Sequence, residues 1–379
     1  MRVLIIPSWY PIGEDKLMGI YHKEYARALK ENGVDTDILY VFRQALKHPI
    51  KYMFMKKYEI DEEDGYKVYR IKMLNLEPIS LKLHMYVYQR KLDKLYKKYI
   101  NVNTKPDVIH AQVTLPAGYA SVKLSKKYDI PLVVTEHSSN FKKYFTDKNK
   151  PYGVSVVKNS KFTVVSNLMK EQAKTITKDV EVIPNVIDTK AFNNDIIKER
   201  TKDIRLLLVS AFRIGKGIET ILNAVDELVN KRHLSVKLTI VGDGYLMDYY
   251  KQIRDDLHLQ KSAHFVGKKE KSEIAKLLTE TDIFIVSSNY ESFCIPGIEA
   301  MASGTPIVST RCGGPEEYID ENVGLLCNVK DPIDMANKIQ ELYNNIDKYD
   351  RNIIKKKAEK YSYKEVSNTA KKIYKKMIK

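Results

Sequence analysis

Short apolar runs alternate with longer amphipathic segments along almost the whole chain, and this alternation constrains the fold more than any other feature. The first two runs, residues 2–7 and 36–42, are separated by a helical pattern over residues 20–32 that Gly33 ends. Further runs occur at residues 68–71, 108–110, 132–135, 161–166 and 180–183. Strands that alternate with helices favour a mostly parallel sheet covered by helices. We therefore expect the first half of the chain to form a doubly wound α/β domain.

A second alternating series follows Pro184 and Asn185. Its strands are expected at residues 205–210, 237–241, 264–267, 283–287 and 306–309, and its helices at about residues 217–231, 245–256, 270–280 and 296–303. A chain of 379 residues is long enough for two domains with separate cores. The sequence thus predicts one Rossmann-like domain over residues 1–183, a second over residues 184–356, and a basic helical tail over residues 357–379.

The chain carries a formal net charge of +16, from 64 Lys and Arg against 48 Asp and Glu, which calls for an anionic partner or surface. Nucleic acid is the least favoured partner, because the sequence has no helix-turn-helix, zinc-finger or aromatic RNA-binding pattern. Cys294, Cys312 and Cys327 lack paired or zinc-binding spacing, which favours free thiols in a reducing cytoplasm. No run approaches the roughly twenty apolar residues that a transmembrane helix needs.

Residues 81–99 form the most telling basic segment. Apolar residues recur there at helical spacing, and six cations lie mostly away from them. A basic amphipathic helix with tyrosines can lie on an anionic membrane, which would place the protein at the inner face of the cell membrane. The other interpretation is an ordinary packed helix whose lysines face solvent. The sequence leaves both open.

Two glutamates, Glu291 and Glu299, bracket a predicted transition from loop to helix. Pro296 suits the first turn of a helix, and Gly304 suits the left-handed residue that ends it. The backbone amides at the start of this helix would point outward at the positive end of its dipole, which favours a bound phosphate. Carboxylates accept hydrogen bonds from hydroxyl groups, so the combination fits a sugar attached to a phosphate. A buried helix with two surface glutamates is the alternative.

This pattern of Glu, seven residues and Glu resembles the donor-site motif of retaining glycosyltransferase family four, the group 1 glycosyltransferases, which have the GT-B fold. The resemblance extends over nearly the whole chain. It implies two Rossmann-like domains that face a central cleft, with the C-terminal helix crossing back to the first domain. It also implies that Glu299 holds the nucleotide ribose, and that Glu291 and the backbone of Phe293, Cys294 and Ile295 hold the sugar. Cys294 stands where the family usually has glycine, so we expect a reshaped sugar pocket.

The loop after the predicted strand 205–210 carries Arg213 and Lys216, and it resembles the family element whose cations hold the donor diphosphate. Cations placed there would stabilise the charge that develops on the leaving group. Their spacing is shorter than is usual in the family, and a basic turn that opens a surface helix is the alternative. Gly242, within residues 241–244, resembles the glycine loop of the donor site.

Two histidines of the first domain are predicted to lie near the acceptor. His137 follows the strand 132–135, where the family has a histidine beside the transferred sugar and the acceptor. Histidine can donate to a sugar hydroxyl or exchange a proton near neutral pH. His110 ends the preceding strand and is expected to lie in a similar place, one strand away.

The loop before the first helix supplies two further candidates. Gly19 resembles the family's glycine loop, whose amides face the donor phosphate, although Met18 precedes it where a second glycine is usual. Trp9 is the only tryptophan of the chain, and we expect it either to stack on an acceptor sugar or to anchor its loop.

The resemblance therefore implies a retaining hexosyltransferase that works without a metal or cofactor. It would move a sugar from a nucleotide diphosphate sugar, UDP-sugar favoured over GDP-sugar, to a glycan or lipid-linked acceptor. In this interpretation the catalytic residues are His137, Glu291, Arg213 and Lys216. The expected products are cell-surface polysaccharide, teichoic acid or glycolipid of the cell wall. A non-catalytic scaffold subunit with the same fold and a nucleotide-sugar epimerase are the alternatives.

Overall fold

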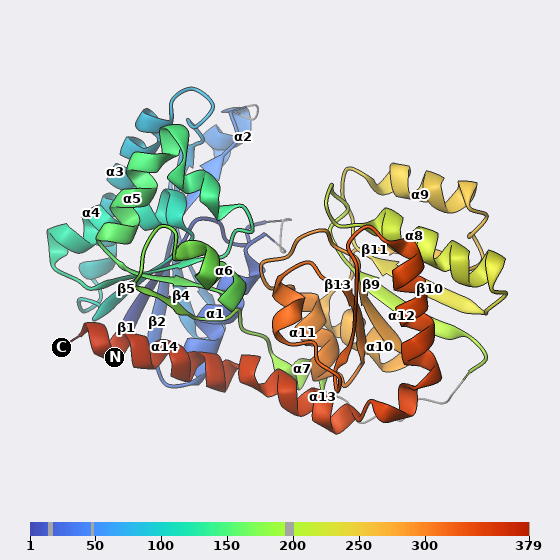
Figure 1. Cartoon of the computed structure of the whole chain (residues 1–379). Helices are drawn as coiled ribbons and strands as arrows, with labels where there is room; N and C mark the ends of the chain where they lie inside the picture. Colours follow the sequence, from blue (N-terminus) through green and yellow to red (C-terminus); the bar gives the residue numbers. More distant parts are fainter. Residues whose placement is uncertain (14–17, 47–48, 194–200, 379) are drawn as a thin grey trace. The chain divides into compact units, whose positions relative to one another are not determined.

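The computed structural model describes residues 1–13, 18–46, 49–193 and 201–378. The chain divides into two compact units, in which a sheet is covered by helices (Figure 1). Unit 1 comprises Met1–Val186 and Tyr363–Lys379, and unit 2 comprises Ile187–Ser362. Both boundaries lie slightly later than the sequence placed them. At the second one, the helix α13 (Arg351–Ala358) packs against α11 (Ile295–Ala302) of unit 2, so the turn that follows α13 stays with that unit.

Within the described residues, unit 1 contains an eight-stranded sheet in the order β3-β4-β2-β1-β5-β6-β7-β8. Its strands are β1 (Arg2–Pro7), β2 (Asp35–Gln44), β3 (Tyr58–Glu63), β4 (Tyr66–Leu74), β5 (Val108–Gln112), β6 (Leu132–Glu136), β7 (Lys161–Val164) and β8 (Val180–Val182). Every neighbouring pair is parallel except β3 and β4, which are antiparallel. The strand order reverses between β1 and β5, and ligands of open α/β sheets bind at the carboxyl ends of strands at such a point.

The helices of unit 1 lie against this sheet. They are α1 (Ile20–Glu31), α2 (Pro49–Phe54), α3 (Leu81–Ile100), α4 (Tyr119–Tyr128), α5 (Lys150–Lys158), α6 (Asn167–Ala173) and α14 (Tyr363–Met377). The helix α14 comes from the end of the chain, and its Ile373 and Tyr374 join the core formed by β1, β2 and α1. Its Ser367 hydroxyl donates to the backbone carbonyl of Ala28 in α1 at 2.9 Å. The return of the C-terminal helix to the first domain is therefore confirmed.

The helix α3 covers the whole of the segment 81–99. Its apolar stripe is buried and comprises Leu81, Met85, Tyr88, Leu92, Leu95 and Tyr99. The helix packs against β2, β4 and α4 through this stripe. The structure shows the segment as a packed helix whose apolar stripe is not available to a membrane, and membrane binding through its basic face stays a prediction. Among the described residues, no helix is both long and apolar enough to span a bilayer.

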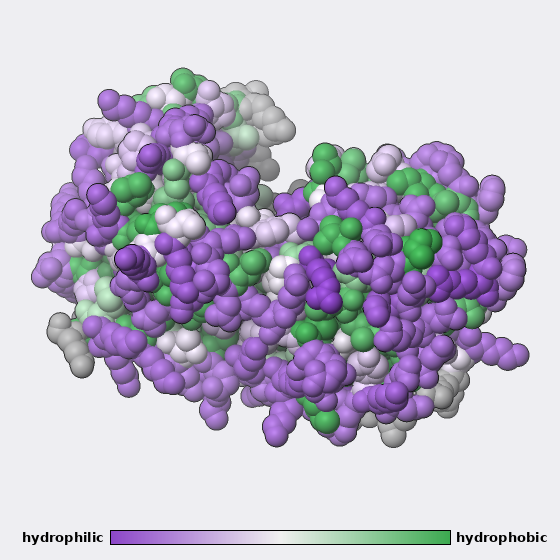
Figure 2. Space-filling view, in the orientation of Figure 1, coloured by the Kyte–Doolittle hydropathy of each residue, from purple (hydrophilic) through white to green (hydrophobic). Residues whose placement is uncertain are grey.

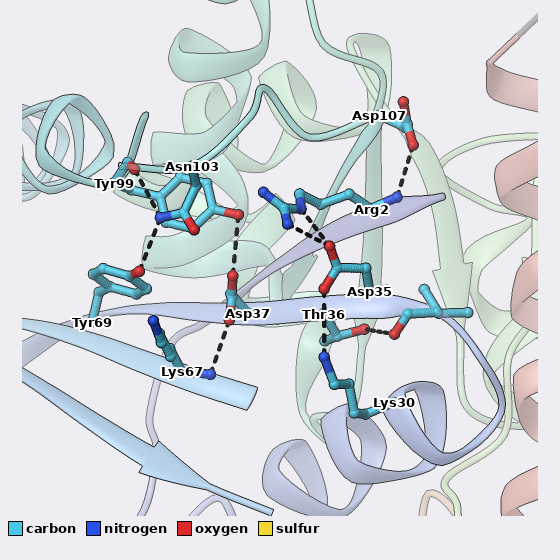
Figure 3. A network of polar contacts seen from close by, with 11 residues as sticks. Arg2, Lys30, Asp35, Thr36, Asp37, Lys67, Tyr69, Tyr99, Asn103 and Asp107 are labelled. Atoms are coloured by element: carbon cyan, nitrogen blue, oxygen red, sulfur yellow. Dashed lines mark hydrogen bonds and ion pairs between the residues drawn. The ribbon is translucent and has the colours of Figure 1, made fainter. Parts of the chain in front are cut away.

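A polar network holds β1, β2 and α3 together at the amino ends of the strands (Figure 3). The Arg2 guanidinium donates to Asp35 at 2.6 Å. Asp37 accepts a hydrogen bond from the backbone N–H of Lys67 at 2.9 Å and from the Tyr99 hydroxyl of α3 at 3.3 Å. Burial raises the pKa of the Asp37 carboxyl. The network fixes α3 at the edge of the sheet opposite to the carboxyl ends of the parallel strands.

Unit 2 contains a six-stranded, entirely parallel sheet within the described residues, in the order β11-β10-β9-β12-β13-β14. Its strands are β9 (Ile204–Val209), β10 (Val236–Val241), β11 (Ala263–Gly267), β12 (Ile283–Val286), β13 (Ile307–Thr310) and β14 (Gly324–Cys327). The order reverses between β9 and β12. The prediction of two doubly wound α/β domains is thus confirmed.

Four helices of unit 2 agree closely with the sequence pattern, namely α8 (Ile218–Asp226), α9 (Met247–Asp256), α10 (Lys271–Glu280) and α11. The sequence did not predict α7 (Thr189–Phe192), α12 (Pro332–Asn344) or α13. The core lies between the sheet and α8 and α12, and includes Leu206, Ile221 and Ile339. On the face that Figure 2 draws, hydrophobic patches interrupt a mostly hydrophilic surface, as is usual for folded domains.

Candidate functional site

The Glu291–Glu299 motif lies at the carboxyl edge of the unit 2 sheet, where the strand order reverses. One loop, residues 210–217, leads from β9 to α8, and a second, residues 287–294, leads from β12 to α11. The first loop carries Arg213 and Lys216, and the second carries Glu291. Topology alone therefore places the predicted diphosphate loop beside the predicted sugar motif.

Hydrogen bonds join the two loops directly. The Ser287 hydroxyl donates to the Lys216 carbonyl at 3.0 Å, and the Asn289 N–H donates to the Gly215 carbonyl at 2.8 Å. Gly217 permits this approach: its φ is +61°, and a Cβ there would lie 1.9 Å from the Ser287 carbonyl oxygen. No other residue type fits such a contact at a left-handed backbone position. The glycine after Lys216 is thus needed for the meeting of the loops.

Lys216 and Glu291 form an ion pair across the loops. The Lys216 ammonium donates to Glu291 Oε1 at 2.5 Å, and the Ser288 hydroxyl donates to the same oxygen at 2.7 Å. Both charged side chains are largely withdrawn from solvent. The Glu291 backbone is also fixed, because its N–H donates to the Cys312 carbonyl at 2.7 Å and its carbonyl accepts from Gly314 N–H at 2.9 Å. A cation and a carboxylate are therefore held in one fixed place.

Cys294 is the residue before α11, and it adopts a left-handed backbone with φ +69°. This conformation is the one that glycine takes without strain, which explains in physical terms why glycine suits the position. The Tyr318 hydroxyl donates to the Cys294 carbonyl at 3.3 Å. Burial, and then the nearby Glu291 carboxylate, raises the pKa of the Cys294 thiol, so the sulfur stays protonated. Cys294 therefore contributes an uncharged thiol to the site and not a reactive thiolate.

The other predicted donor residues of this motif have different environments. Phe293 is buried, with its ring 5.3 Å from that of Tyr361 in a T-shaped contact. Ile295 is partly buried at the first position of α11. Glu299 lies just over one turn further on and is buried as well. Glu291 and the amino end of α11 thus lie beside the loop of Lys216, and the buried Phe293 ring anchors the motif in the core.

Arg213 belongs to the loop 210–217, and Gly242, which follows β10, packs against the start of the same loop. Arg213 is exposed, and its backbone carbonyl accepts from the Tyr250 hydroxyl at 3.4 Å. Gly242 has φ +140°, and a Cβ there would lie 1.8 Å from the Ser210 carbonyl oxygen. Its N–H donates to the Gly267 carbonyl at 2.9 Å. Gly242 is therefore required by the close packing of the loops, and its contact with a donor stays a prediction.

In unit 1, His137 directly follows β6 and is held at both ring nitrogens. Nδ1 lies 2.8 Å from Asn185 Oδ1, and Nε2 lies 2.6 Å from Gln112 Oε1. Burial lowers the pKa of His137 to about 4, so the ring is neutral at pH 7. A neutral imidazole has one N–H, and it can donate in only one of these contacts. His137 is thus an oriented, uncharged ring.

His22 and Tyr21 surround this ring. The His22 ring stands edge-on to His137 at 5.0 Å, and the Tyr21 ring also lies at 5.0 Å. His22 is fully buried, and neither of its ring nitrogens has a hydrogen-bond partner among the described residues. Burial lowers its pKa far below 6.5, and His137 and His110 lower it further. His22 therefore supports His137 as an uncharged packing group.

Trp9 and Gly19 together shape the loop at the start of α1. The Trp9 indole donates to the Tyr21 hydroxyl at 2.6 Å, and the ring is partly buried. Gly19 has φ +74°, and a Cβ there would lie 2.6 Å from the Trp9 carbonyl oxygen. These contacts are those of a loop anchor, one of the two expected roles of Trp9. Residues 14–17 of the predicted glycine loop lie outside the described residues.

His110 does not lie where the sequence placed it. Its side chain has no exposed surface, and its two ring nitrogens lie 2.6 Å from the Tyr374 hydroxyl and 2.7 Å from the Thr135 hydroxyl. The strand β5 continues to Gln112, so its carboxyl end carries Gln112 rather than His110. Both nitrogens of His110 serve the core of unit 1, and this arrangement contradicts an acceptor-binding role.

Two family profiles cover the chain almost end to end. The profile described as "Glycosyltransferase Family 4" matches residues 18–191, and the one described as "Glycosyl transferases group 1" matches residues 189–361. The chain belongs to the group 1, family 4 glycosyltransferases. The first match lies mostly in unit 1, and the second, with the Lys216 and Glu291 loops, lies in unit 2.

Individual relatives agree with this assignment. The chain is 26% identical to a glycogen synthase of Mycobacterium tuberculosis over 259 residues, which are 64% of this chain and 61% of that relative, so it spans about three fifths of that protein. It is 27% identical over 360 residues to TuaC of Bacillus subtilis, which carries the name of a teichuronic acid biosynthesis glycosyltransferase; the match covers 89% of this chain and 88% of TuaC.

A solved structure confirms the fold. Anabaena HepE, crystallised with UDP, superimposes with a TM-score of 0.72 at 17% identity, over 99% of this chain and 100% of HepE. The chain therefore has the predicted GT-B fold, in the sense of two Rossmann-like units in one chain.

The sequence did not predict two residues that contact a predicted site residue: Gln112 and Asn185 hold the His137 ring. Ser288, which just precedes Glu291 and is expected from the sequence to shape the same loop, holds the Glu291 carboxylate. The signal for Gln112 lies in the strand predicted at residues 108–110. The two residues that follow are also compatible with a strand, and a strand extended over them ends at Gln112. Asn185 follows a conspicuous Pro184, but its partner lies far away in sequence, and only the folded chain brings the two together.

The chain contains one Asp-x-Asp sequence, at residues 35–37. Asp35 pairs with Arg2 at 2.5 Å, and Asp37 accepts from Lys67 and Tyr99. These carboxylates lie at the amino ends of the strands, away from the loops described above. In the described part of the chain, no group of three or more His, Cys, Asp and Glu side chains is arranged to hold a metal ion.

Proposed function

We propose that this chain is a retaining, metal-independent hexosyltransferase that uses a nucleotide diphosphate sugar, with UDP-sugar favoured. The acceptor is a glycan or lipid-linked sugar in the synthesis of cell-surface polysaccharide, teichoic acid or glycolipid. One observation carries the proposal: Lys216 and Glu291, from loops far apart in sequence, meet at the reversal point of the unit 2 sheet. HepE, which shares the fold, has been crystallised with UDP and with UDP-glucose, and the name of TuaC supports a cell-surface product.

The leaving diphosphate is the first group that the site must stabilise. Lys216 is anchored at its backbone by Ser287 and at its ammonium by Glu291, so it is oriented before a donor binds. Arg213 is exposed in the same loop and supplies a second cation. In a partly buried loop these charges stabilise developing negative charge with little reorganisation. A bound diphosphate would accept hydrogen bonds from the Lys216 ammonium, which now donates to Glu291. The Glu291 carboxylate oxygens would then be able to accept hydrogen bonds from sugar hydroxyls.

Glu291 and Glu299 are assigned to hydroxyl recognition. Glu291 accepts from Ser288 through the same oxygen that accepts from Lys216, and this fixes its orientation. A carboxylate accepts only, so each oxygen selects a donor such as a ribose or sugar hydroxyl. Glu299 is buried in α11 and is assigned to the ribose, as the family resemblance implies.

His137 is assigned to the sugar and acceptor side of the reaction. Because its pKa is lowered to about 4, it acts as a neutral hydrogen-bonding ring and not as a strong acid at pH 7. The acceptor proton passes to the leaving phosphate, and no separate general base is needed. The reaction takes place in the cytoplasm, close to the membrane that carries a lipid-linked acceptor.

A transfer assay tests the proposal. Release of UDP or GDP is measured from UDP-glucose, UDP-galactose, UDP-N-acetylglucosamine and GDP-mannose, with an alkyl glucoside as acceptor. The anomeric configuration of the product is read by NMR. Lys216→Met and Glu291→Gln should each lower kcat by about a hundredfold or more, the usual loss for one oriented stabilising group. Lys276→Ala, an exposed lysine of α10, is the matched control and should leave turnover unchanged.

Full activity in Lys216→Met would contradict the assigned role of the pair. A product of inverted configuration would contradict the retaining mechanism, and loss of activity in metal-chelated buffer would contradict metal independence. Donor binding without any transfer would favour the scaffold alternative.

A further inference from the structure

The solvent-exposed face of α3 has apolar side chains near one end and cationic side chains near the other. Exposed residues recur every three or four positions, with Leu83 and Tyr86 near the amino end and Arg90, Lys94 and Lys97 toward the carboxyl end. Residues at this spacing share one face of a helix. Leu83 is 44% exposed and Tyr86 is 54% exposed, so both apolar side chains are accessible to a partner. One face of α3 therefore joins an apolar end to a cationic end.

A groove runs along this cationic end. It has a volume of about 680 Å³, and its charged lining comprises Arg90, Lys91, Lys94, Lys97, Lys127 and Asp93. The helices α3 and α4, which carry these residues, pack against each other. The one carboxylate among the described lining residues, Asp93, is already bonded to Lys127 at 2.7 Å and to Tyr128 at 3.0 Å. The groove thus has a large excess of positive charge.

Neighbouring lysines extend this excess. Burial lowers the pKa of Lys91, and the charges of Lys57, Lys94 and Lys72 lower it further. Like charges that repel one another across a surface groove are relieved by a bound anion. The hydrogen bond from Tyr99 to Asp37 ties this carboxyl end of α3 to the sheet, which restrains the helix from moving away from them. The cations are therefore held in place for an anionic partner.

Building on the proposed function, we infer that the α3 face docks on an anionic membrane, where the groove binds lipid phosphates and Leu83 and Tyr86 enter the interface. A membrane fits better than a nucleic acid, because exposed aliphatic and aromatic side chains beside lysines gain free energy at a lipid interface. Ile79, just before α3, is also exposed and adds to the apolar end. The surface differs from the stripe suggested by the sequence, which is buried in unit 1.

Vesicle flotation tests the inference with the full-length chain. Phosphatidylcholine vesicles with phosphatidylglycerol should bind the protein, and vesicles of phosphatidylcholine alone should not. The triple variant Arg90→Gln, Lys94→Gln, Lys97→Gln should bind roughly a hundredfold more weakly, since each cation near an anionic surface contributes several-fold. Leu83→Ser with Tyr86→Ser should also weaken binding without changing charge. Raised salt should weaken binding of the native chain.

The control is a second triple variant with the same change in charge. Lys364→Gln, Lys372→Gln, Lys375→Gln alters three exposed lysines of α14 in the same unit and should bind as the native chain does. Equal loss in both variants would show that only net charge matters and would overturn the inference. Inorganic pyrophosphate and a random oligonucleotide serve as competitors for vesicle binding by the native chain. If either abolishes this binding at low concentration, the inference is also overturned. Thermal shift by UDP should persist in both triple variants, so failure of docking is distinguishable from failure of the proposed donor site.

Discussion

Mild acid should selectively weaken unit 1, because the four described histidines of this unit are held without charge. Burial lowers the pKa of His110 to about 3 and those of His84 and His137 to about 4, and it lowers the pKa of His22 far below the ordinary value of 6.5. The rings of His22 and His137 lie 5.0 Å apart. Protonation of any of them in the folded state would place a charge among apolar side chains and other histidines.

The sign and size follow from proton linkage. Between the folded pKa values and 6.5, the unfolded chain binds more protons than the folded chain, so the free energy of unfolding falls as pH falls. At about pH 5, His84, His110 and His137 each lower the free energy of unfolding by about 2 kcal/mol relative to about pH 7.5, about 6 kcal/mol together, and His22 lowers it further. Burial raises the pKa of Glu136, which acts in the opposite direction. The loss remains large beside the 5–15 kcal/mol of a typical domain.

The only tryptophan gives a local probe for this prediction. Trp9 lies in unit 1 and donates to Tyr21, so its fluorescence reports unfolding of this unit. Urea titrations at about pH 7.5 and about pH 5, each followed by Trp9 fluorescence, give the two free energies of unfolding.

A histidine-deleted variant isolates the cause. His22→Phe keeps a ring and removes one proton site whose nitrogens have no hydrogen-bond partner among the described residues. Its loss of stability in acid should therefore be smaller than that of the native chain. His264→Gln, at an exposed position of β11, should change nothing. An acid loss as large in His22→Phe as in the native chain would refute the reasoning.

Three further substitutions test local features. Cys294→Gly should be more stable to urea than Cys294→Ala by about 1 kcal/mol, because only glycine takes φ +69° without strain; equal stabilities would contradict this. Gly217→Ala should cost about 2 kcal/mol more than Gly215→Ala, since both have positive φ but only Gly217 faces a carbonyl within 1.9 Å; similar melting temperatures would count against it. Tyr374→Phe should cost about 1–3 kcal/mol by leaving buried partners unpaired, which Trp9-monitored unfolding would show or exclude.

The sequence predicted elements well where one residue pattern dominates. The apolar runs of β1, β9 and β12 and the helices α8, α10 and α11 lie within a few residues of their predicted places. The Glu291 motif was placed correctly as a loop that enters a helix, because proline and glycine mark both ends of α11 locally.

The errors share a physical cause, which is contact between distant residues. His110 was assigned to the edge of the sheet because the strand was ended early, and only the pairing of Gln112 with Thr135 on β6 shows where β5 stops. The apolar stripe of α3 looks the same whether it faces a membrane or β2 and β4. The partners of His137 could not be predicted, since Gln112 and Asn185 come from separate segments.

Nucleotide binding tests the central claim most directly. Thermal unfolding is measured with UDP, GDP, ADP and their common sugar conjugates, on the native chain and on Lys216→Met, Arg213→Ala and Glu299→Gln. A ligand at about a hundredfold its dissociation constant should add roughly 2.7 kcal/mol. We predict a shift with UDP that is lost or strongly reduced in the three variants and kept in Lys276→Ala. No shift with any of these nucleotides, or an equal shift in Lys216→Met, would contradict a donor site at the Lys216–Glu291 pair.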